Sequence, residues 1–152
     1  MPRGVASDTD AITTLIFTYA ERLDAGDFDG VARLFEHATF RSDKHPAVRR
    51  GSAEVLDVYR STVATYDGSP CTKHVTTNVI VEIDTDGTTA AARSYFTVLQ
   101  ARPELPLQVI IAGRYHDRFA CTAGVWHFTD RLILVDLVGD LRFHLKQNTL
   151  HT

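Results

Sequence analysis

The chain has 152 residues, of which 44% are apolar and 23% are charged, and this size and composition predict one globular domain with a single core. Sixteen basic residues against 19 acidic ones leave a formal net charge of -3, which argues against nucleic-acid binding. No apolar run is long enough to span a membrane, and the first residues lack the apolar core of a signal peptide. A cytoplasmic protein with no membrane partner is therefore expected.

The cysteine, histidine and glycine patterns exclude several kinds of site. Cys71 and Cys121 form no CxxC pair, and none of the seven histidines belongs to an HxH or HExxH motif. No glycine-rich phosphate loop occurs. We therefore expect no metal, no other cofactor and no disulfide framework.

The first part of the chain predicts two helices that meet at a tight corner. Apolar residues at helical spacing predict an amphipathic helix over 8–24, with Ser7 and Asp10 as a start that resembles a capping box. Gly26 suits the C-terminal cap of this helix. Asp27 can then cap the second helix.

The remainder of the chain changes from helix to strand. A short extended piece over 38–41 and a polar loop through Pro46 and Gly51 precede a third helix that opens at Ser52. Runs rich in β-branched and aromatic residues then predict long strands over 71–83, 88–101, 107–119 and 125–138. The turn residues between these runs favour antiparallel neighbours. Helices followed by an antiparallel meander indicate the α+β class.

The order of these elements resembles the nuclear-transport-factor-2-like superfamily in its SnoaL-like and scytalone-dehydratase-like branch. The segments that carry the resemblance are YAERLDAGDFDGVARLF, TKHVTTNVIVEIDTDGTTAAARSYF, AGRYHDRF and GVWHFTDRLIL. The resemblance covers about residues 8–138 of a single domain, with 1–7 and 141–152 as tails. It implies a cone-shaped α+β barrel, in which three N-terminal helices pack on a curved, mainly antiparallel sheet around an apolar pocket. Members include dehydratases, isomerases, cyclases and non-catalytic binders, so the fold alone does not decide the activity.

Asp24 is the first candidate catalytic residue. At the end of the first helix its charge faces the negative end of the helix dipole, which costs a few tenths to about 1 kcal/mol. A role other than helix stability is therefore expected. The resemblance implies one, because the matching position in scytalone dehydratase and in hexachlorocyclohexane dehydrochlorinase holds the aspartate of an Asp-His dyad. The alternative is an exposed aspartate in a helix-terminal turn.

His74, in the segment KHVTTN, matches the position of the dyad histidine in those lyases. Histidine can accept a proton near neutral pH, and a bonded carboxylate would hold its tautomer and raise its basicity. In strict alternation, however, His74 lies on the more polar face of its strand. Either this face lines a polar cavity, or a bulge shifts the register, or the histidine lies on the surface.

Three further residues are candidates through the resemblance. Tyr19 lies on the apolar face of the first helix, and its spacing to Asp24 resembles that in bile-acid 7α-dehydratases and steroid isomerases, where the hydroxyl bonds a substrate oxygen. Arg131 matches a basic pocket position of the bile-acid dehydratases, and Tyr115 matches a pocket position of the dehydrochlorinase. The alternatives are that Tyr19 only packs in the core and that Arg131 is a solvent-exposed residue of its strand.

Departures from the relatives narrow the expected chemistry. Ser42 stands where steroid isomerases place their catalytic acid, and Leu23 stands where scytalone dehydratase has a tyrosine. Arg93, Asp117 and Asp130 do not reproduce the Asp-Arg-Asp set of limonene epoxide hydrolases. Isomerase chemistry by an acid at position 42, epoxide hydrolysis by an Asp-Arg-Asp set and scytalone itself as substrate are therefore not expected.

The leading hypothesis is a cofactor-independent lyase, most simply a dehydratase, that acts on a small hydrophobic hydroxy-carbonyl compound, cyclic or open. His74 would take a C–H proton, Asp24 would orient the imidazole, and Tyr19 would bond a substrate oxygen. The alternatives are a non-catalytic small-molecule binder or assembly subunit, and an isomerase or cyclase that uses the same proton transfer. The apolar strand faces predict a homo-oligomer, a dimer or a trimer.

Overall fold

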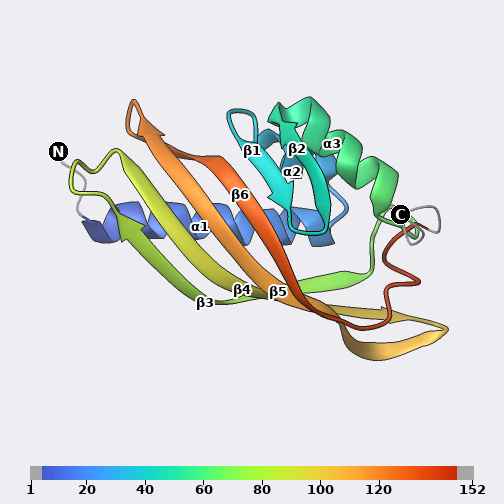
Figure 1. Ribbon diagram of the computed structural model, residues 1–152. Helices are drawn as coiled ribbons and strands as arrows, with labels where there is room; N and C mark the ends of the chain where they lie inside the picture. Colours follow the sequence, from blue (N-terminus) through green and yellow to red (C-terminus); the bar gives the residue numbers. More distant parts are fainter. Residues whose placement is uncertain (1–4, 147–152) are drawn as a thin grey trace.

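A curved sheet of six strands wraps around the first helix in the computed structural model, which describes residues 5–146 (Figure 1). The helices are α1 (Val5–Asp24), α2 (Phe28–Arg33) and α3 (Gly51–Thr62). The strands are β1 (Thr39–Ser42), β2 (His45–Arg50), β3 (Thr72–Ile83), β4 (Thr89–Arg102), β5 (Leu105–Thr122) and β6 (Val125–Val138). The predicted α+β class is confirmed. In the described part of the chain, no helix has both the length and the apolar character needed to cross a membrane.

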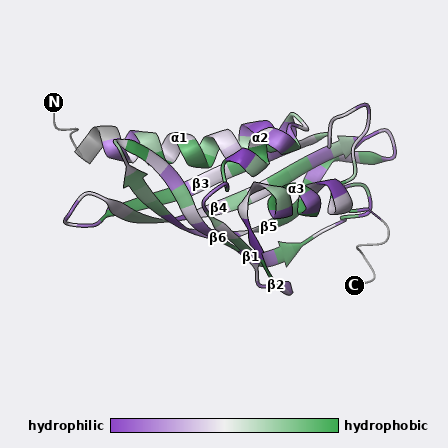
Figure 2. Ribbon diagram, turned by 90° about the horizontal axis from the view of Figure 1, so that it is seen from above, coloured by the Kyte–Doolittle hydropathy of each residue, from purple (hydrophilic) through white to green (hydrophobic). Residues whose placement is uncertain are grey.

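The strands follow the order β2-β1-β6-β5-β4-β3, so β2 and β3 form the two edges of the sheet. All neighbouring strands are antiparallel except β1 and β6, which are parallel. The predicted mainly antiparallel sheet is therefore confirmed. Figure 2 shows α1 lying over one face of this sheet, with α2 and α3 near the same side.

The corner between α1 and α2 forms as the sequence predicts. Gly26 has a φ of 76°, which glycine adopts without strain, and a Cβ there would lie 1.9 Å from the Gly68 carbonyl oxygen. Asp27 caps α2, and its carboxylate accepts a hydrogen bond of 2.9 Å from the Gly30 backbone N–H. α1, however, already begins at Val5 and not after Ser7. Asp8 therefore lies in its first turn, where its carboxylate accepts a hydrogen bond of 3.1 Å from Trp126 Nε1.

Residues 45–50 form an edge strand and not the expected polar loop. β2 pairs with β1, and Phe40 lies opposite Arg49. Proline is tolerated at a sheet edge because one side of an edge strand needs no ladder hydrogen bonds, so Pro46 does not prevent the pairing. β2 therefore extends the sheet by one strand beyond β1.

A β-bulge in β3 lets His74 and the later apolar residues of this strand face inward together, although strict alternation would place them on opposite faces. The pairing with β4 shifts between Thr77 and Ile80, and Asn78 has a φ of 54°. Before the bulge His74 is half-buried and Val75 is exposed, whereas after it the inward residues are Val79, Val81 and Ile83. The bulge therefore turns His74 inward while the rest of the strand still buries its apolar face.

The core lies between the apolar face of α1 and the inner face of the sheet. Its fully buried aromatic side chains include Phe35, Phe119 and Phe128. A charged pair lies within this core, because Arg131 and Asp117 have side chains with 0% exposure. Arg131 donates two hydrogen bonds to Asp117, from Nε at 2.8 Å and from Nη2 at 2.9 Å.

The segment after β6 packs against the domain, whereas a tail was expected from residue 141 onward. Leu141 and Phe143 contact the core cluster, and the Phe143 carbonyl accepts hydrogen bonds from Tyr66 Oη at 2.7 Å and Gln100 Nε2 at 3.0 Å. In Figure 1 this segment runs back beside the end of α3. The expected tail residues 1–4 and 147–152 lie outside the described residues.

We predict that the buried pair is more important for stability than any exposed ion pair. Asp117→Asn leaves the Arg131 guanidinium buried without a counter-charge and lowers the free energy of unfolding by about 3–5 kcal/mol. Arg93→Gln, which breaks the exposed pair with Glu82, is the control and changes it by less than about 1 kcal/mol. Urea unfolding of both variants tests this, and equal losses would contradict it.

Candidate functional site

A cavity of about 600 Å³ lies between α1, α3, the inner face of the sheet and the segment after β6. Most of its wall is apolar, with side chains that include Leu23, Phe40, Val58, Phe96, Val98 and Ile133. Its polar groups include Tyr19, Tyr59, His74 and His144. A mostly apolar cavity with a few polar groups is typical of a binding site for a small organic molecule.

The structure brings Asp24 and His74 together at one wall of this cavity. His74 Nδ1 lies 2.6 Å from Asp24 Oδ1, and the His74 backbone N–H donates to Asp24 Oδ2 at 2.7 Å. Thr72 Oγ1 donates to Asp24 Oδ1 at 2.8 Å. The two side chains are 11% and 6% exposed, for the aspartate and the histidine respectively. The last residue of α1 is thus hydrogen-bonded to the beginning of β3, the edge strand that carries the histidine.

These contacts determine the charge of Asp24 and the tautomer of His74. Burial by itself would raise the pKa of Asp24, but the hydrogen bonds and charge of His74 and the bond from Thr72 outweigh it and lower the pKa below its ordinary value. An ionised carboxylate only accepts hydrogen bonds, so the proton of the 2.6 Å contact belongs to His74 Nδ1. The lone pair of a neutral His74 is therefore on Nε2.

His144 is a second histidine at this wall, and no motif in the sequence pointed to it. Its ring centroid lies 6.5 Å from that of His74, and the residue is 9% exposed. Burial lowers its pKa to about 4, with a further contribution from His74. Its Nδ1 is buried and has no hydrogen-bond partner within the described part of the chain. His144 is therefore a neutral imidazole beside His74.

Three tyrosines form the aromatic floor of the cavity. The hydroxyls of Tyr19 and Tyr59 are hydrogen-bonded to each other, and the Tyr115 ring lies edge-to-face with that of Tyr19 at 5.8 Å. Burial raises the pKa of all three hydroxyls. They are therefore neutral near pH 7 and can donate hydrogen bonds.

Arg131 lies behind this floor and is not among the residues that line the cavity. Its guanidinium carbon lies 3.8 Å from the Tyr115 ring centroid and 4.3 Å from that of Tyr19. The Asp117 carboxylate raises its pKa against the effect of burial, so the group is a cation. The structure places Tyr19 and Tyr115 on the cavity surface and Arg131 beneath them.

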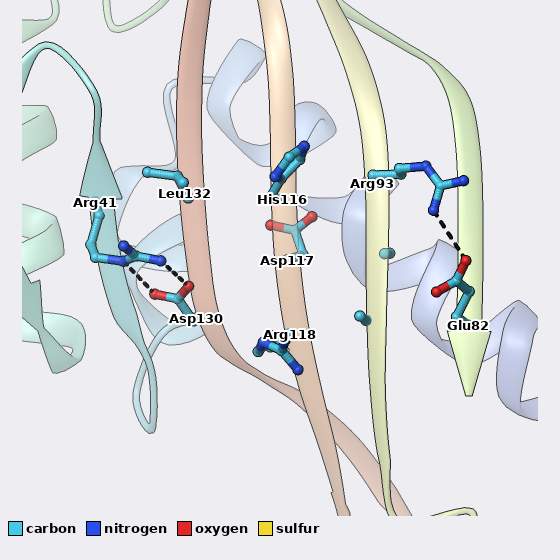
Figure 3. Close-up of a pocket in the computed structure, with 10 residues that line it drawn as sticks. Arg41, Glu82, Arg93, His116, Asp117, Arg118, Asp130 and Leu132 are labelled. Atoms are coloured by element: carbon cyan, nitrogen blue, oxygen red, sulfur yellow. Dashed lines mark hydrogen bonds and ion pairs between the residues drawn. The ribbon is translucent and has the colours of Figure 1, made fainter. Parts of the chain in front are cut away.

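A second hollow of about 320 Å³ lies on the face of the sheet that is turned away from α1 (Figure 3). Two ion pairs lie at its sides, Arg41 with Asp130 at 2.7 Å and Arg93 with Glu82 at 3.1 Å. His116 is exposed there, while Asp117 next to it is buried. The hollow lacks the Asp24–His74 pair, so the inner cavity is the better candidate site. Nowhere in residues 8–146 do three or more potential metal ligands cluster.

Two of the cavity residues carried no functional signal in the sequence. His144 is far from His74 along the chain, and only the packing of the last segment brings the rings together. Tyr59 belongs to α3, and its hydroxyl bond to Tyr19 depends on how α1 and α3 cross. Contacts of this range leave no pattern in a single sequence.

We predict that His144 makes the folded state less stable in mild acid. Because its pKa is about 4 in the folded chain and higher in the unfolded chain, the unfolded chain binds more protons as pH falls from about 6.5 to about 4. The free energy of unfolding should fall over this window by about 3 kcal/mol. His144→Gln should remove this part of the dependence, measured by urea unfolding at several pH values. His116→Gln, at an exposed position, is the control, and a profile unchanged by His144→Gln would contradict the prediction.

Comparison with known proteins identifies the family and the fold. The profile of the SnoaL-like domain matches residues 5–132. Among curated proteins none matches the sequence significantly. Similar solved structures include an NTF2-like protein with a cystatin-like fold from Novosphingobium aromaticivorans, at 18% identity over 86% of this chain and 83% of the other, with a TM-score of 0.72.

Two further structures from the same organism show how varied the fold's relatives are. One is a proposed scytalone dehydratase, 21% identical over 89% of this chain and 88% of its own, with a TM-score of 0.71. The other is a proposed β subunit of an aromatic-ring-hydroxylating dioxygenase, 17% identical over 93% and 98%, with a TM-score of 0.71. These likenesses concern the fold. The predicted SnoaL-like family is confirmed by the profile match, and this chain belongs to it.

Proposed function

We propose that this protein is a cofactor-independent lyase that removes water from a small hydrophobic hydroxy-carbonyl compound. The observation that supports this most directly is the contact of 2.6 Å between Asp24 Oδ1 and His74 Nδ1 at the wall of the cavity. A histidine oriented by an ionised carboxylate is an effective general base. An apolar cavity of about 600 Å³ accommodates a substrate of one or two rings.

His74 is the base in this proposal. Its Nε2 takes a proton from the carbon next to the substrate carbonyl, and the electron pair of that C–H bond moves toward the carbonyl oxygen. Asp24 then faces an imidazolium, whose charge it stabilises through the bond to Nδ1. The three hydrogen bonds on Asp24 hold the carboxylate in place during the transfer.

Tyr19 and Tyr59 supply the hydrogen bond to the developing oxyanion. Only one proton of the two hydroxyls is used in the bond between them, so the other is free to donate into the cavity. The Arg131 cation beneath the Tyr19 ring acts through that ring as a positioning group, because it does not reach the cavity. Tyr115, on the same floor, contacts the substrate ring.

The leaving hydroxyl takes the proton that His74 carries, and water and an enone are the products. Neutral His144 can hydrogen-bond the hydroxyl beside His74 without adding a second positive charge. Atoms and charge balance without any co-reactant. Isomerisation or cyclisation would use the same first proton transfer, so product identity separates these reactions from dehydration.

We predict that the dyad is required for proton abstraction. With 3-hydroxy-1-tetralone as the probe, the wild type should release water to form 1-naphthol, and His74→Gln and Asp24→Asn should each lower kcat by about 100-fold or more. With 2-tetralone, which has no leaving group, the wild type should exchange the α-hydrogens with deuterated solvent and both variants should not. Absorbance and NMR follow the two reactions.

Matched controls keep this test specific. His116→Gln and Asp57→Asn change exposed residues outside the cavity and should retain the wild-type rates. The unfolding midpoint of each variant separates loss of chemistry from loss of fold. Rates in His74→Gln and Asp24→Asn equal to those of the wild type would exclude the dyad mechanism, and no turnover by the wild type itself would favour a protein that only binds its ligand.

A further inference from the structure

We propose that the substrate is an anion, an apolar ring compound that carries a carboxylate, and that Arg49 binds this carboxylate. This proposal takes from the proposed function only that the substrate binds in the inner cavity. It concerns binding and does not depend on the chemical step. It names the substrate class that the dyad alone leaves open. The observation behind it is an unpaired guanidinium on the inner wall of an apolar cavity.

The register of the β1–β2 hairpin turns Arg49 toward the cavity. Arg49 lies directly opposite Phe40, and directly opposed residues of antiparallel strands project from the same face of the sheet. Phe40 is buried against Phe35 and lines the cavity, and so does Arg49. The neighbouring Arg50 projects to the other side and is exposed.

Arg49 has no counter-charge among the described residues. The residue is half-buried, and its side chain makes no hydrogen bond, ion pair or cation–π contact with any residue of 8–146, whereas Arg41 on the adjacent strand is paired with Asp130 at 2.7 Å. A partly desolvated cation beside an apolar wall is costly without a partner. A ligand carboxylate would supply this partner through two parallel hydrogen bonds.

The other charged groups at the cavity add to the same field. Among the described residues that line it there is no Asp or Glu, whereas Lys44 lies there together with Arg49 and with Arg41, whose charge Asp130 compensates. The nearby acidic groups already have partners. Asp136 is paired with Arg114 at 2.9 Å, and its pKa is lowered by that bond and by the charge of Lys44. The Asp43 carboxylate accepts a hydrogen bond of 3.1 Å from the Val135 backbone N–H.

The position of Arg49 also orients the substrate. β2 and β3 are opposite edges of the curved sheet, so Arg49 and His74 reach the cavity from opposite walls. A carboxylate held at Arg49 directs the rest of the molecule toward the dyad and the tyrosine floor. The carboxylate is thereby kept away from Asp24, which it would otherwise repel.

The test compares two ligands of the same shape and different charge. Calorimetric titration near pH 7.5 with 2-naphthoate and with neutral 2-naphthamide should show tighter binding of naphthoate to the wild type, by about tenfold or more. Arg49→Gln should lose this preference by weakening naphthoate alone. Arg50→Gln, one residue away on the opposite face, is the matched control and should retain it.

Further variants separate the proposal from its rivals. Asp24→Asn should retain the naphthoate preference even if it abolishes turnover, so failure of the dyad mechanism and failure of this inference give different results. Equal affinity of the wild type for the two ligands, or no measurable binding of naphthoate, would overturn the inference. So would a preference that survives in Arg49→Gln but disappears in Lys44→Gln or His74→Gln, because the carboxylate would then bind at those residues.

Discussion

The Asp24 carboxylate joins the end of α1 to the edge of the sheet, and the geometry of the candidate site depends on this connection. Its oxygens accept hydrogen bonds from the Thr72 hydroxyl, the His74 backbone and the His74 ring. A charge at the C-terminal end of a helix is unfavourable in isolation, and these charge-assisted bonds offset that cost. The same contacts that attach α1 to β3 therefore orient the imidazole, so fold and site share one interaction.

The bulge in β3 makes this connection compatible with a packed core. Regular alternation would place either His74 or the later valines of β3 outward, because residues of even and odd number lie on opposite faces. The left-handed Asn78 shifts the register, and both groups then face inward. Bulges recur near functional sites for this reason, since they re-aim one side chain without disturbing the rest of the strand.

The cavity is kept open by a floor that combines aromatic rings with a buried charge. Tyr115 is stacked on Phe96 with ring centroids 4.6 Å apart, and Arg131 supports the floor from the opposite side while Asp117 compensates its charge. The resemblance implied that Arg131 contacts the substrate directly, but this side chain is fully buried and does not line the cavity. The cationic side chains that do line the cavity belong to the β1–β2 hairpin, where the sequence predicted only a short extended piece and a loop.

Local patterns in the sequence determined the α+β class, the helix corner at Gly26 and Asp27, and the four long strands, because periodicity and turn chemistry act over a few residues. The family resemblance added Asp24, His74 and Tyr19 as candidates. Only the tertiary structure decided that the first two lie within hydrogen-bonding distance, that His144 and Tyr59 join them, and that Arg49 faces the same cavity. The physical reason is distance along the chain. These residues come from α1, α3, both sheet edges and the last segment, and their contacts form through packing that no local spacing records.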